Sequence, residues 1–339
     1  MAGVTIKDVA RAANVSVATV SRALNGHDNV TDEVRRRVAA IAEQMNYSPH
    51  AAARSLSSRR THAIGVVLPD LYGEFFSELV RGIDQVAREH GLHLLVSSYH
   101  GHREEQGAAM RAMRGRVDGL LVMSPYAASA GIVGDGGAAG LPLVLINSQD
   151  AGEGAVALGV ANYDGAVAMV EHLVDCGHRR IAFIAGPDDN FDAHQRLSGY
   201  RDALARRLPG TEPLVLPGDF SESSGHRAGV ELLARTPRPD AVFAANDMMA
   251  LGCLFAFTQA GVRVPDDIAL AGFDDIPLAR FVHPGLTTMR VDIFELGARA
   301  ARMLLARLGD ERESPPATPL QPQLVVRESS APRRGADSS

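Results

Sequence analysis

The residues with the clearest chemistry near the N-terminus follow Ser16 at the spacing of one helical face. Val17, Ala18, Ser21 and Arg22 would point to the same side of a helix. An arginine can fork onto the O6 and N7 atoms of a guanine, and small apolar side chains contact thymine methyl groups. We therefore predict that this face reads base edges in the major groove of DNA.

Three short helices would hold this face. Thr5 and Asp8 form a helix start signal, in which the hydroxyl is expected to cap free backbone N–H groups, and Ser16 can cap a second helix that runs to about Leu24. Two helices this short are marginal alone, so a third helix after Thr31 completes a helix-turn-helix unit. A small helical cap on an enzyme is the alternative interpretation.

The distribution of charge favours the first interpretation. Residues 1–60 carry nine lysines and arginines against five acids, whereas the whole chain has a formal net charge of −6. A basic head on an acidic body is typical of a DNA reader with a separate domain that does not bind DNA.

From His62 onward, apolar runs that suit buried strands alternate with helical patterns. Repeated strand–helix units predict parallel sheets with right-handed crossovers, and two such series predict two α/β lobes. The predicted strands are 62–68, 92–97, 117–123, 141–146, 180–185, 213–216, 241–245, 269–273 and 324–326, and the predicted helices are 76–91, 104–114, 165–176, 195–207, 223–235 and 248–260.

Polar and aromatic side chains follow these strands at their carboxyl ends. Ligands of open parallel sheets bind beyond those ends, and two facing lobes would bring them together in a cleft. Arginine and carboxylates can hold neighbouring hydroxyls, and aromatic rings stack on a sugar ring. Because only Arg196 is cationic, the set suits a polyol or monosaccharide better than an anion. The candidates are Asp70, Phe75, Phe76, Ser124, Asn147, Asn190, Asp192, Arg196, Phe220, Asn246, Asp247 and Asp274.

Several of these candidates also have a purely structural interpretation. Asn246 could only cap the helix that follows it, and Asp274 could only form a turn. Phe220 could belong to the core, and Arg196 could be a solvated helix residue. The prediction of a ligand site therefore depends on the convergence of the whole set.

Motifs for catalysis, cofactors or metals are missing from the sequence. No G-x-G-x-x-G or P-loop opens a strand–helix unit, and no serine lies in G-x-S-x-G. His100 and His102 lack a third ligand, and Cys176 and Cys253 are expected to be free thiols. We therefore expect no enzyme activity, no cofactor and no metal.

No secretory leader precedes Val4, and no apolar run approaches membrane-spanning length. We therefore expect a cytoplasmic protein without a membrane partner.

The segments VTIKDVARAANVSVATVSRALNG and VTDEVRRRVAAIAEQMNYSPHAAARSL resemble the LacI/GalR family of bacterial transcription regulators. The resemblance implies a small all-α helix-turn-helix domain followed by an α/β two-lobed, periplasmic-binding-protein-like domain with two parallel sheets (type I). The implied boundaries are 1–48 for the DNA-binding domain, 49–61 for a hinge helix and linker, 62–328 for the effector-binding domain and 329–339 for a disordered tail. Lobe 1 would comprise 62–161 and 292–318, and lobe 2 would comprise 162–291 and 319–328.

This resemblance implies a repressor that binds a palindromic operator as a homodimer under the control of a small effector, for which we expect a sugar. A nucleoside, a purine or another metabolite acting as co-repressor is an alternative effector, and a sugar-binding receptor without DNA function is an alternative class. In the family, a hinge helix forms on the operator, where Ala53 and Arg54 would line the minor groove and Leu56 would wedge into a base step. The predicted DNA contacts are Thr5, Ser16, Val17, Ala18, Thr19, Ser21, Arg22, Asn25, Tyr47, Ala53, Arg54 and Leu56.

The resemblance also aligns eight of the cleft candidates with effector contacts. Two positions depart from the pattern of many sugar-responsive members. Ala161 precedes Asn162 where those members have an aspartate, and Val291 replaces a glutamine that is common after the LTT motif. Both departures concern which sugar could bind. The aligned residues are Phe75, Phe76, Asn190, Asp192, Arg196, Phe220, Asn246 and Asp274.

Overall fold

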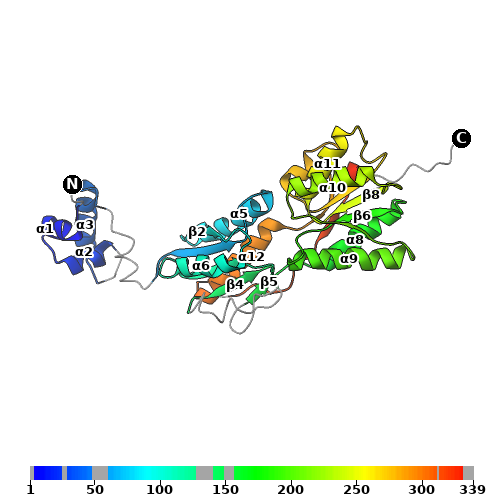
Figure 1. Cartoon of the computed structure of the whole chain (residues 1–339). Helices are drawn as coiled ribbons and strands as arrows, with labels where there is room; N and C mark the ends of the chain where they lie inside the picture. The colour runs from blue at the N-terminus through cyan, green and yellow to red at the C-terminus, as the bar shows by residue number, and fades with distance from the viewer. Residues whose placement is uncertain are drawn as a thin grey trace. The chain divides into compact units, whose positions relative to one another are not determined.

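The structure is a computed structural model that describes residues 4–24, 29–47, 60–126, 140–148, 156–310 and 313–330 (Figure 1). Internal contacts divide the chain into two compact units. The smaller unit is Met1–His62 with Gly115–Val117, and the larger is Ala63–Arg114 with Asp118–Ser339.

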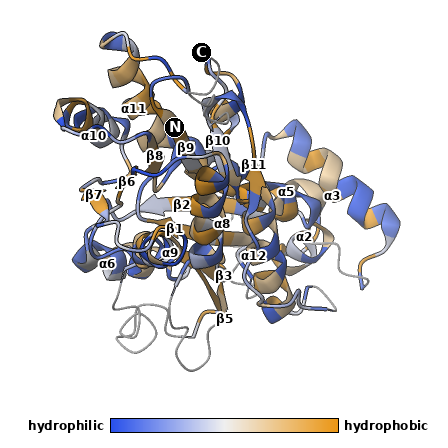
Figure 2. Ribbon diagram, turned by 90° about the vertical axis from the view of Figure 1, so that its right-hand side faces the viewer, coloured by the Kyte–Doolittle hydropathy of each residue, from blue (hydrophilic) through white to orange (hydrophobic). Residues whose placement is uncertain are grey.

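The described part of the smaller unit contains the three predicted helices, α1 (Ile6–Ala13), α2 (Val17–Leu24) and α3 (Asp32–Gln44). One valine from each helix, Val9, Val20 and Val38, is fully buried at the centre. Hydrophilic and hydrophobic residues alternate along α3, as Figure 2 shows, because only one face of this helix is covered. The helix-turn-helix interpretation is therefore confirmed.

The start of α1 differs in detail from the prediction. The Thr5 hydroxyl donates to Asp8 Oδ2 at 2.6 Å, and the Thr5 backbone N–H donates to the same oxygen at 3.0 Å. The acid therefore makes the cap, and the hydroxyl holds the acid in place. Asn14 ends α1 in the left-handed conformation with φ 52°, which asparagine tolerates better than most residues.

The larger unit contains two sheets, and we call each sheet with its helices a lobe. In the first lobe five parallel strands lie in the order β2-β1-β3-β4-β5. Their bounds are β1 (Ala63–Leu68), β2 (His93–Ser98), β3 (Gly119–Met123), β4 (Leu143–Ile146) and β5 (Val156–Leu158). The helices of this lobe are α5 (Glu74–Glu89), α6 (Arg103–Met113) and α12 (Ile293–Leu308).

In the second lobe six strands lie in the order β11-β10-β9-β8-β6-β7. Their bounds are β6 (Ile181–Ile184), β7 (Leu214–Leu216), β8 (Ala241–Ala244), β9 (Ala269–Asp274), β10 (Thr287–Arg290) and β11 (Gln323–Val325). The helices are α8 (Asn162–Asp175), α9 (Phe191–Arg207), α10 (Glu222–Ala234) and α11 (Asp247–Gln259), with short 3-10 turns η1 (Pro277–Arg280) and η2 (Glu328–Ser330). The two-lobed α/β prediction is confirmed, except that β11 pairs antiparallel with β10.

Three elements were not predicted: β5, β10 and α12. The two strands are three and four residues long, and β10 (TTMR) is not an apolar run like the predicted strands. Helix α12 lies in Figure 1 among the elements of the first lobe, where it packs on α5. The two helices approach so closely that a Cβ at Gly82 would collide with the backbone carbonyl of Phe294.

The C-terminal boundary also differs from the prediction. Ser329 and Ser330, which the sequence assigns to a disordered tail, are fully buried. The Ser329 hydroxyl donates to the Leu270 carbonyl at 2.6 Å and accepts from the Thr287 amide at 2.8 Å. The second lobe therefore extends through Ser330.

Candidate DNA-reading face and effector cleft

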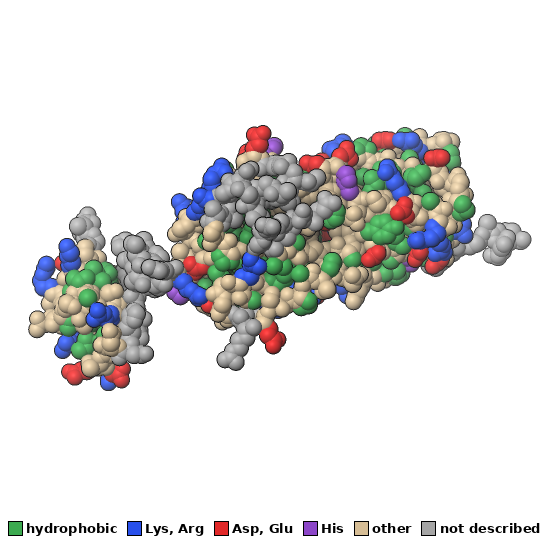
Figure 3. Space-filling view, turned by 90° about the horizontal axis from the view of Figure 1, so that it is seen from below, with side chains coloured by type: hydrophobic (Ala, Val, Ile, Leu, Met, Phe, Trp, Pro, Cys, Tyr) green, Lys and Arg blue, Asp and Glu red, His purple; other side chains and the backbone are tan. Residues whose placement is uncertain are grey.

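The predicted reading face of α2 is free of packing within the described part of the smaller unit. Val17 is 40% exposed and Ala18 and Arg22 also face solvent, whereas Val20 and Ala23 are buried. Lysine and arginine side chains are visible around the surface of this unit in Figure 3. The side chains that could reach base edges are thus separated from those that hold the helix in place.

The start of α2 is fixed by local hydrogen bonds. Ser16 Oγ accepts from the Thr19 amide at 3.1 Å and lies 2.8 Å from Thr19 Oγ1. Ser21 and Tyr47 are half-buried, and Tyr47 packs against the core of the unit. The remaining predicted DNA contacts, Asn25, Ala53, Arg54 and Leu56, lie outside the described residues.

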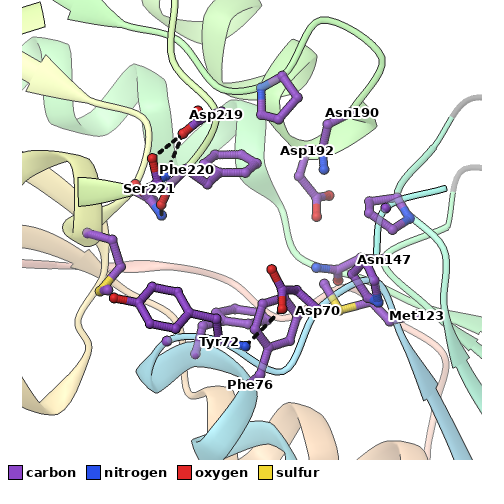
Figure 4. A pocket seen from close by; sticks show the side chains of 18 of the residues that line it. Asp70, Tyr72, Phe76, Met123, Asn147, Asn190, Asp192, Asp219, Phe220 and Ser221 are labelled. Carbon is purple, nitrogen blue, oxygen red and sulfur yellow. Dashed lines mark hydrogen bonds between the residues drawn. The ribbon is translucent and has the colours of Figure 1, made fainter. Parts of the chain in front are cut away.

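The larger unit contains a cavity of about 290 Å³ between the two lobes. Figure 4 shows side chains from both lobes pointing into it. Ten of the twelve candidate residues line this space. Ser124 does not, and its side chain is buried. The lining residues that were predicted are Asp70, Phe75, Phe76, Asn147, Asn190, Asp192, Arg196, Phe220, Asn246 and Asp274.

Asp247, the other candidate that does not line the cavity, has a structural role. Its carboxyl accepts hydrogen bonds from the Thr288 hydroxyl at 2.6 Å and from the Ile276 amide at 2.9 Å. It is fully buried, and burial raises its pKa well above the ordinary value. We therefore interpret Asp247 as a brace between α11 and the neighbouring strands.

Arg196 lies at the centre of the polar end of the cavity and is 4% exposed. Its Nε donates to Asn162 Oδ1 at 2.8 Å, its Nη1 donates to the Ala245 carbonyl at 2.5 Å, and its Nη2 lies 3.3 Å from Asp274 Oδ1. The guanidinium also stacks 3.9 Å from the ring centroid of Phe273. The structure therefore rules out a solvated arginine at this position.

Two buried carboxyls share this arginine. Burial raises the pKa of Asp192 and of Asp274 to about 6, although the charge of Arg196 lowers both values. Asp274 Oδ1 forms the ion pair with Arg196 but accepts no well-aligned hydrogen bond from the described residues, and Asn147 Oδ1 has no partner among them. These two buried oxygens belong to residues that line the cavity, and neither has a well-aligned hydrogen bond from the described residues.

The asparagines at the helix starts act as caps as well as lining the cavity. Asn190 Oδ1 accepts from the Ala193 amide and Asn246 Oδ1 accepts from the Met249 amide, each at 3.0 Å. Asn246 also donates to the Phe220 carbonyl at 3.0 Å. The capping interpretation of Asn246 is confirmed, and this role orients the amide toward the cavity.

The backbone around the cavity is strained. Asn147, Phe220 and Asp274 lie at the ends of strands or in the loops after them, with φ of 51°, 70° and 113°. Residues other than glycine rarely adopt such angles, and they cluster at functional sites because the surrounding structure must hold them there. The conformational energy of these unfavourable backbone angles is therefore carried by residues that line the cavity.

Several lining residues were not predicted. These residues, which belong to loops or helix starts, are Tyr72, His100, Tyr126, Asp219 and Met248. Only their closeness in sequence to predicted contacts could have indicated them. Among them, the Tyr72 hydroxyl donates to Glu222 at 3.0 Å across the mouth of the cavity.

Within the described residues, no group of three or more histidine, cysteine or acidic side chains could hold a metal ion. Helices long and apolar enough to cross a membrane are likewise absent from the part of the chain that the structure describes.

Comparison with known proteins agrees with this architecture. The family model "Bacterial regulatory proteins, lacI family" matches residues 5–50, and that of a periplasmic binding protein-like domain matches residues 170–330. The HTH-type transcriptional repressor PurR of Escherichia fergusonii is 35% identical over 330 residues, which are 96% of this chain and 97% of that protein.

Solved structures agree over almost the full length. The lac repressor dimer bound to operator and the anti-inducer ONPF has a TM-score of 0.86 at 30% identity, covering 97% of this chain and 100% of that chain. The complex of the transcriptional regulator CelR with cellobiose has a TM-score of 0.68 at 32% identity, covering 96% and 99%. This chain therefore belongs to the lacI family of bacterial regulatory proteins, as a DNA-binding transcriptional regulator controlled by a ligand.

Proposed function

We propose that this regulator represses transcription as a homodimer on a palindromic operator, and that a small polyhydroxylated ligand in the cleft sets its affinity for DNA. The ligand class we favour is a neutral sugar. The observation that carries this proposal is the cavity itself, in which buried carboxyl and amide oxygens and aromatic rings surround a single arginine.

The two unsatisfied acceptors favour a ligand that is rich in hydrogen-bond donors. A buried acceptor without a partner costs about 1–3 kcal/mol, and Asn147 Oδ1 and Asp274 Oδ1 come from opposite lobes. Sugar hydroxyls would donate to both. Because a ligand that bridges the lobes binds one lobe arrangement better than others, it could shift the affinity for DNA.

The charges around the cavity argue against an anionic ligand. Arg196 is engaged with Asn162, Ala245 and Asp274, so few of its donors remain for a phosphate or carboxylate. Four aspartates line the cavity beside this arginine. Phe75 and Phe76 pack edge to face with ring centroids 5.5 Å apart and offer an apolar wall for the C–H face of a sugar ring.

One of the similar structures supports a carbohydrate, because CelR was solved with cellobiose. An aromatic wall could equally stack a nucleobase, so a nucleoside or purine is the second candidate.

For the DNA complex, we propose that the exposed face of α2 enters the major groove. Arg22 would fork onto a guanine, and Val17 and Ala18 would contact thymine methyl groups. Two heads related by a two-fold axis would read the two halves of an inverted repeat. Because the target is chromosomal DNA, we expect the protein to act in the cytoplasm.

Two experiments with the full chain test this function. Selection from a random duplex library should enrich an inverted repeat, whereas a chain that enriches none would be a ligand receptor without DNA function. A thermal-shift screen should then find neutral sugars that raise the melting temperature, because a ligand of the folded state stabilises it.

The screen should include nucleosides, purines and sugar phosphates beside the neutral sugars. Stabilisation by a nucleoside or purine alone would replace the sugar as the ligand class. Asp274→Ala should abolish the response, while Glu171→Gln, a change in an exposed ion pair with Arg206, should leave it intact.

A further inference from the structure

Asn162 occupies the point where the chain crosses from the first lobe to the second. The first lobe's sheet ends at β5, and Asn162 is the first residue of α8. The crossing segment pairs with a second one, because the Ala161 amide donates to the Leu320 carbonyl and the Leu320 amide donates to the Gly159 carbonyl, each at 2.9 Å. A side chain at this position can therefore link the cleft to the segment that connects the two lobes.

The Asn162 side chain is 1% exposed and uses both ends of its amide within the cleft. Its Nδ2 donates to Asp192 Oδ1 at 2.8 Å, and its Oδ1 accepts from Arg196 Nε at 2.8 Å. Both partners lie on α9, one turn apart. Asn162 thereby fixes a carboxylate and a guanidinium at once.

The hydrogen-bonded chain continues into both lobes. Asn147, which follows β4 of the first lobe, lies beside Asp192, and its amide lowers the pKa of that carboxyl. Figure 4 shows the Asp192 carboxylate and the Asn147 amide pointing toward one another. In the other direction, Arg196 pairs with Asp274 at the end of β9 in the second lobe. The two ends of the chain are Asn147 and Asp274, which line the cavity from opposite lobes.

We propose that Asn162 is a positioning residue of the effector cleft, which holds the ligand-facing acceptors of the two lobes in register from the crossing segment. This inference rests on the proposed role of the cleft as the effector site. Occupation of the two acceptors would thus be transmitted to the crossing segment through Asp192 and Arg196.

The chemistry of an amide suits this position better than the alternatives. Alanine would leave Arg196 Nε and Asp192 Oδ1 without this partner in a buried site. Aspartate would still accept from Arg196, but it would place a second carboxylate against Asp192. The amide of Asn162 donates to the carboxylate of Asp192 through its nitrogen and accepts from the guanidinium of Arg196 through its oxygen, without adding a charge.

The first test measures contact between the lobes by amide hydrogen exchange of the full chain without ligand. The Phe191 amide donates to the Pro125 carbonyl across the lobes at 2.6 Å, one residue before Asp192. Asn162→Ala should speed exchange of this amide about tenfold or more, because Asp192 loses its anchor. Tyr163→Phe is the matched control, since it removes the bond of the next residue to Asp202, 2.9 Å long and exposed.

The second test measures a pH profile, which a purely structural role would not change. The groups that face Asp192 are Arg196 on its own helix, Asn162 on α8, Asn147 after β4 and Asp274 at the end of β9. Asn162→Asp should lower the melting temperature by about 4 °C more at pH 8 than at pH 5, because two adjacent carboxyls cannot both ionise freely. In an Asp192→Asn background this difference should vanish.

Unchanged Phe191 exchange in Asn162→Ala, or a pH-independent penalty in Asn162→Asp, would overturn the proposal. Neither measurement uses a ligand. A failed sugar screen would therefore contradict the proposed ligand class and leave this inference standing. If instead the Asn162 variants gave either of the two overturning results, the inference would fail and the ligand class would stand.

Discussion

The reading face of α2 and the effector cleft use polar side chains in opposite ways. In the head, the bonds that hold the site are local, such as those of Thr5 with Asp8 and of Ser16 with Thr19. Val17, Ala18 and Arg22, the side chains proposed to read bases, are exposed and do not take part in these bonds. In the cleft, Asn162 bonds Asp192, thirty residues away, and Arg196 bonds the carbonyl of Ala245, forty-nine residues away.

This difference predicts where the energetic cost of a substitution should appear. A residue on the reading face can be truncated without leaving a buried group unpaired, so the change should affect DNA affinity alone. A residue of the cleft network leaves a buried partner behind, so the change should also lower the free energy of unfolding.

The largest effect should come from Arg196→Met, which removes the only arginine of the cavity while keeping much of its volume. Asp192 and Asp274 would then be buried without a counter-charge, and breaking a buried pair in this way costs about 3–5 kcal/mol. Urea unfolding at pH 8 measures the loss, which should shrink at pH 5 because the carboxyls can take up protons.

The control for this prediction is Arg206→Met, in which the lost partner Glu171 is 40% exposed. An exposed pair of this kind contributes about 0–1 kcal/mol. Equal losses in the two variants would mean that the cleft network contributes no more than a surface ion pair.

The same contrast explains which parts of the molecule the sequence could predict. The caps of α1 and α2 depend on residues three apart, so their chemistry is visible in the sequence even where the roles of Thr5 and Asp8 differ from expectation. The long strands and helices of the body were predicted because each carries its own periodic pattern.

Most of the features that the sequence did not predict depend on contacts between residues that lie far apart in the chain. The short strand β10 lies between β9 and β11, and it is held there by pairing with both. The helix α12 is a different case, because it has its own cap at Asp292 and its own stop at Gly309, and the sequence analysis overlooked these signals. Ser124 follows a strand like the true lining residues, but its side chain is buried and does not line the cavity. Tyr72 lines the cavity because Glu222 of the other lobe lies opposite. Distances between lobes cannot be read from spacing in the sequence.

The second prediction concerns pH. Asp192 and Asp274, with pKa values of about 6 in the folded chain and 3.8 ordinarily, bind more protons when folded between pH 4 and 6. The free energy of unfolding should therefore be highest below pH 4 for these groups, fall as the pH rises to about 6 and then level off. Each carboxyl contributes about 3 kcal/mol to this fall in the free energy of unfolding.

Urea unfolding between pH 4 and 8 would measure this slope for the intact chain and for Asp192→Asn. The variant should lose its share of the slope, since an amide does not titrate in this range. A profile in which stability rises with pH in both proteins would contradict the raised pKa values of the cleft.

The third prediction returns to the reading face. Arg22→Ala should weaken operator binding by about 1–3 kcal/mol and relax the preference at one base pair of each half-site, because the fork onto a guanine is lost. Competition gel shifts with single base-pair substitutions measure both effects.

Arg22 is exposed, so the melting temperature of the Arg22→Ala variant should not change. Arg37→Ala, an exposed change on α3, is the control, and a uniform loss without altered preference would reduce Arg22 to a phosphate contact.

The smallest effect should come from Ser16→Ala, which removes the oxygen that accepts from the Thr19 amide. Loss of such a cap costs about 1 kcal/mol. It should lower the melting temperature of the smaller unit without altering the preference for any base pair. Ser77→Ala makes the same exchange inside α5, where the hydroxyl only donates to the Gly73 and Glu74 carbonyls and alanine is the better helix former. Circular dichroism melts should therefore show a loss for the first variant and none for the second. If both variants lost the same stability, position at the helix start would be irrelevant, and the reading face would owe its orientation to packing rather than to its cap.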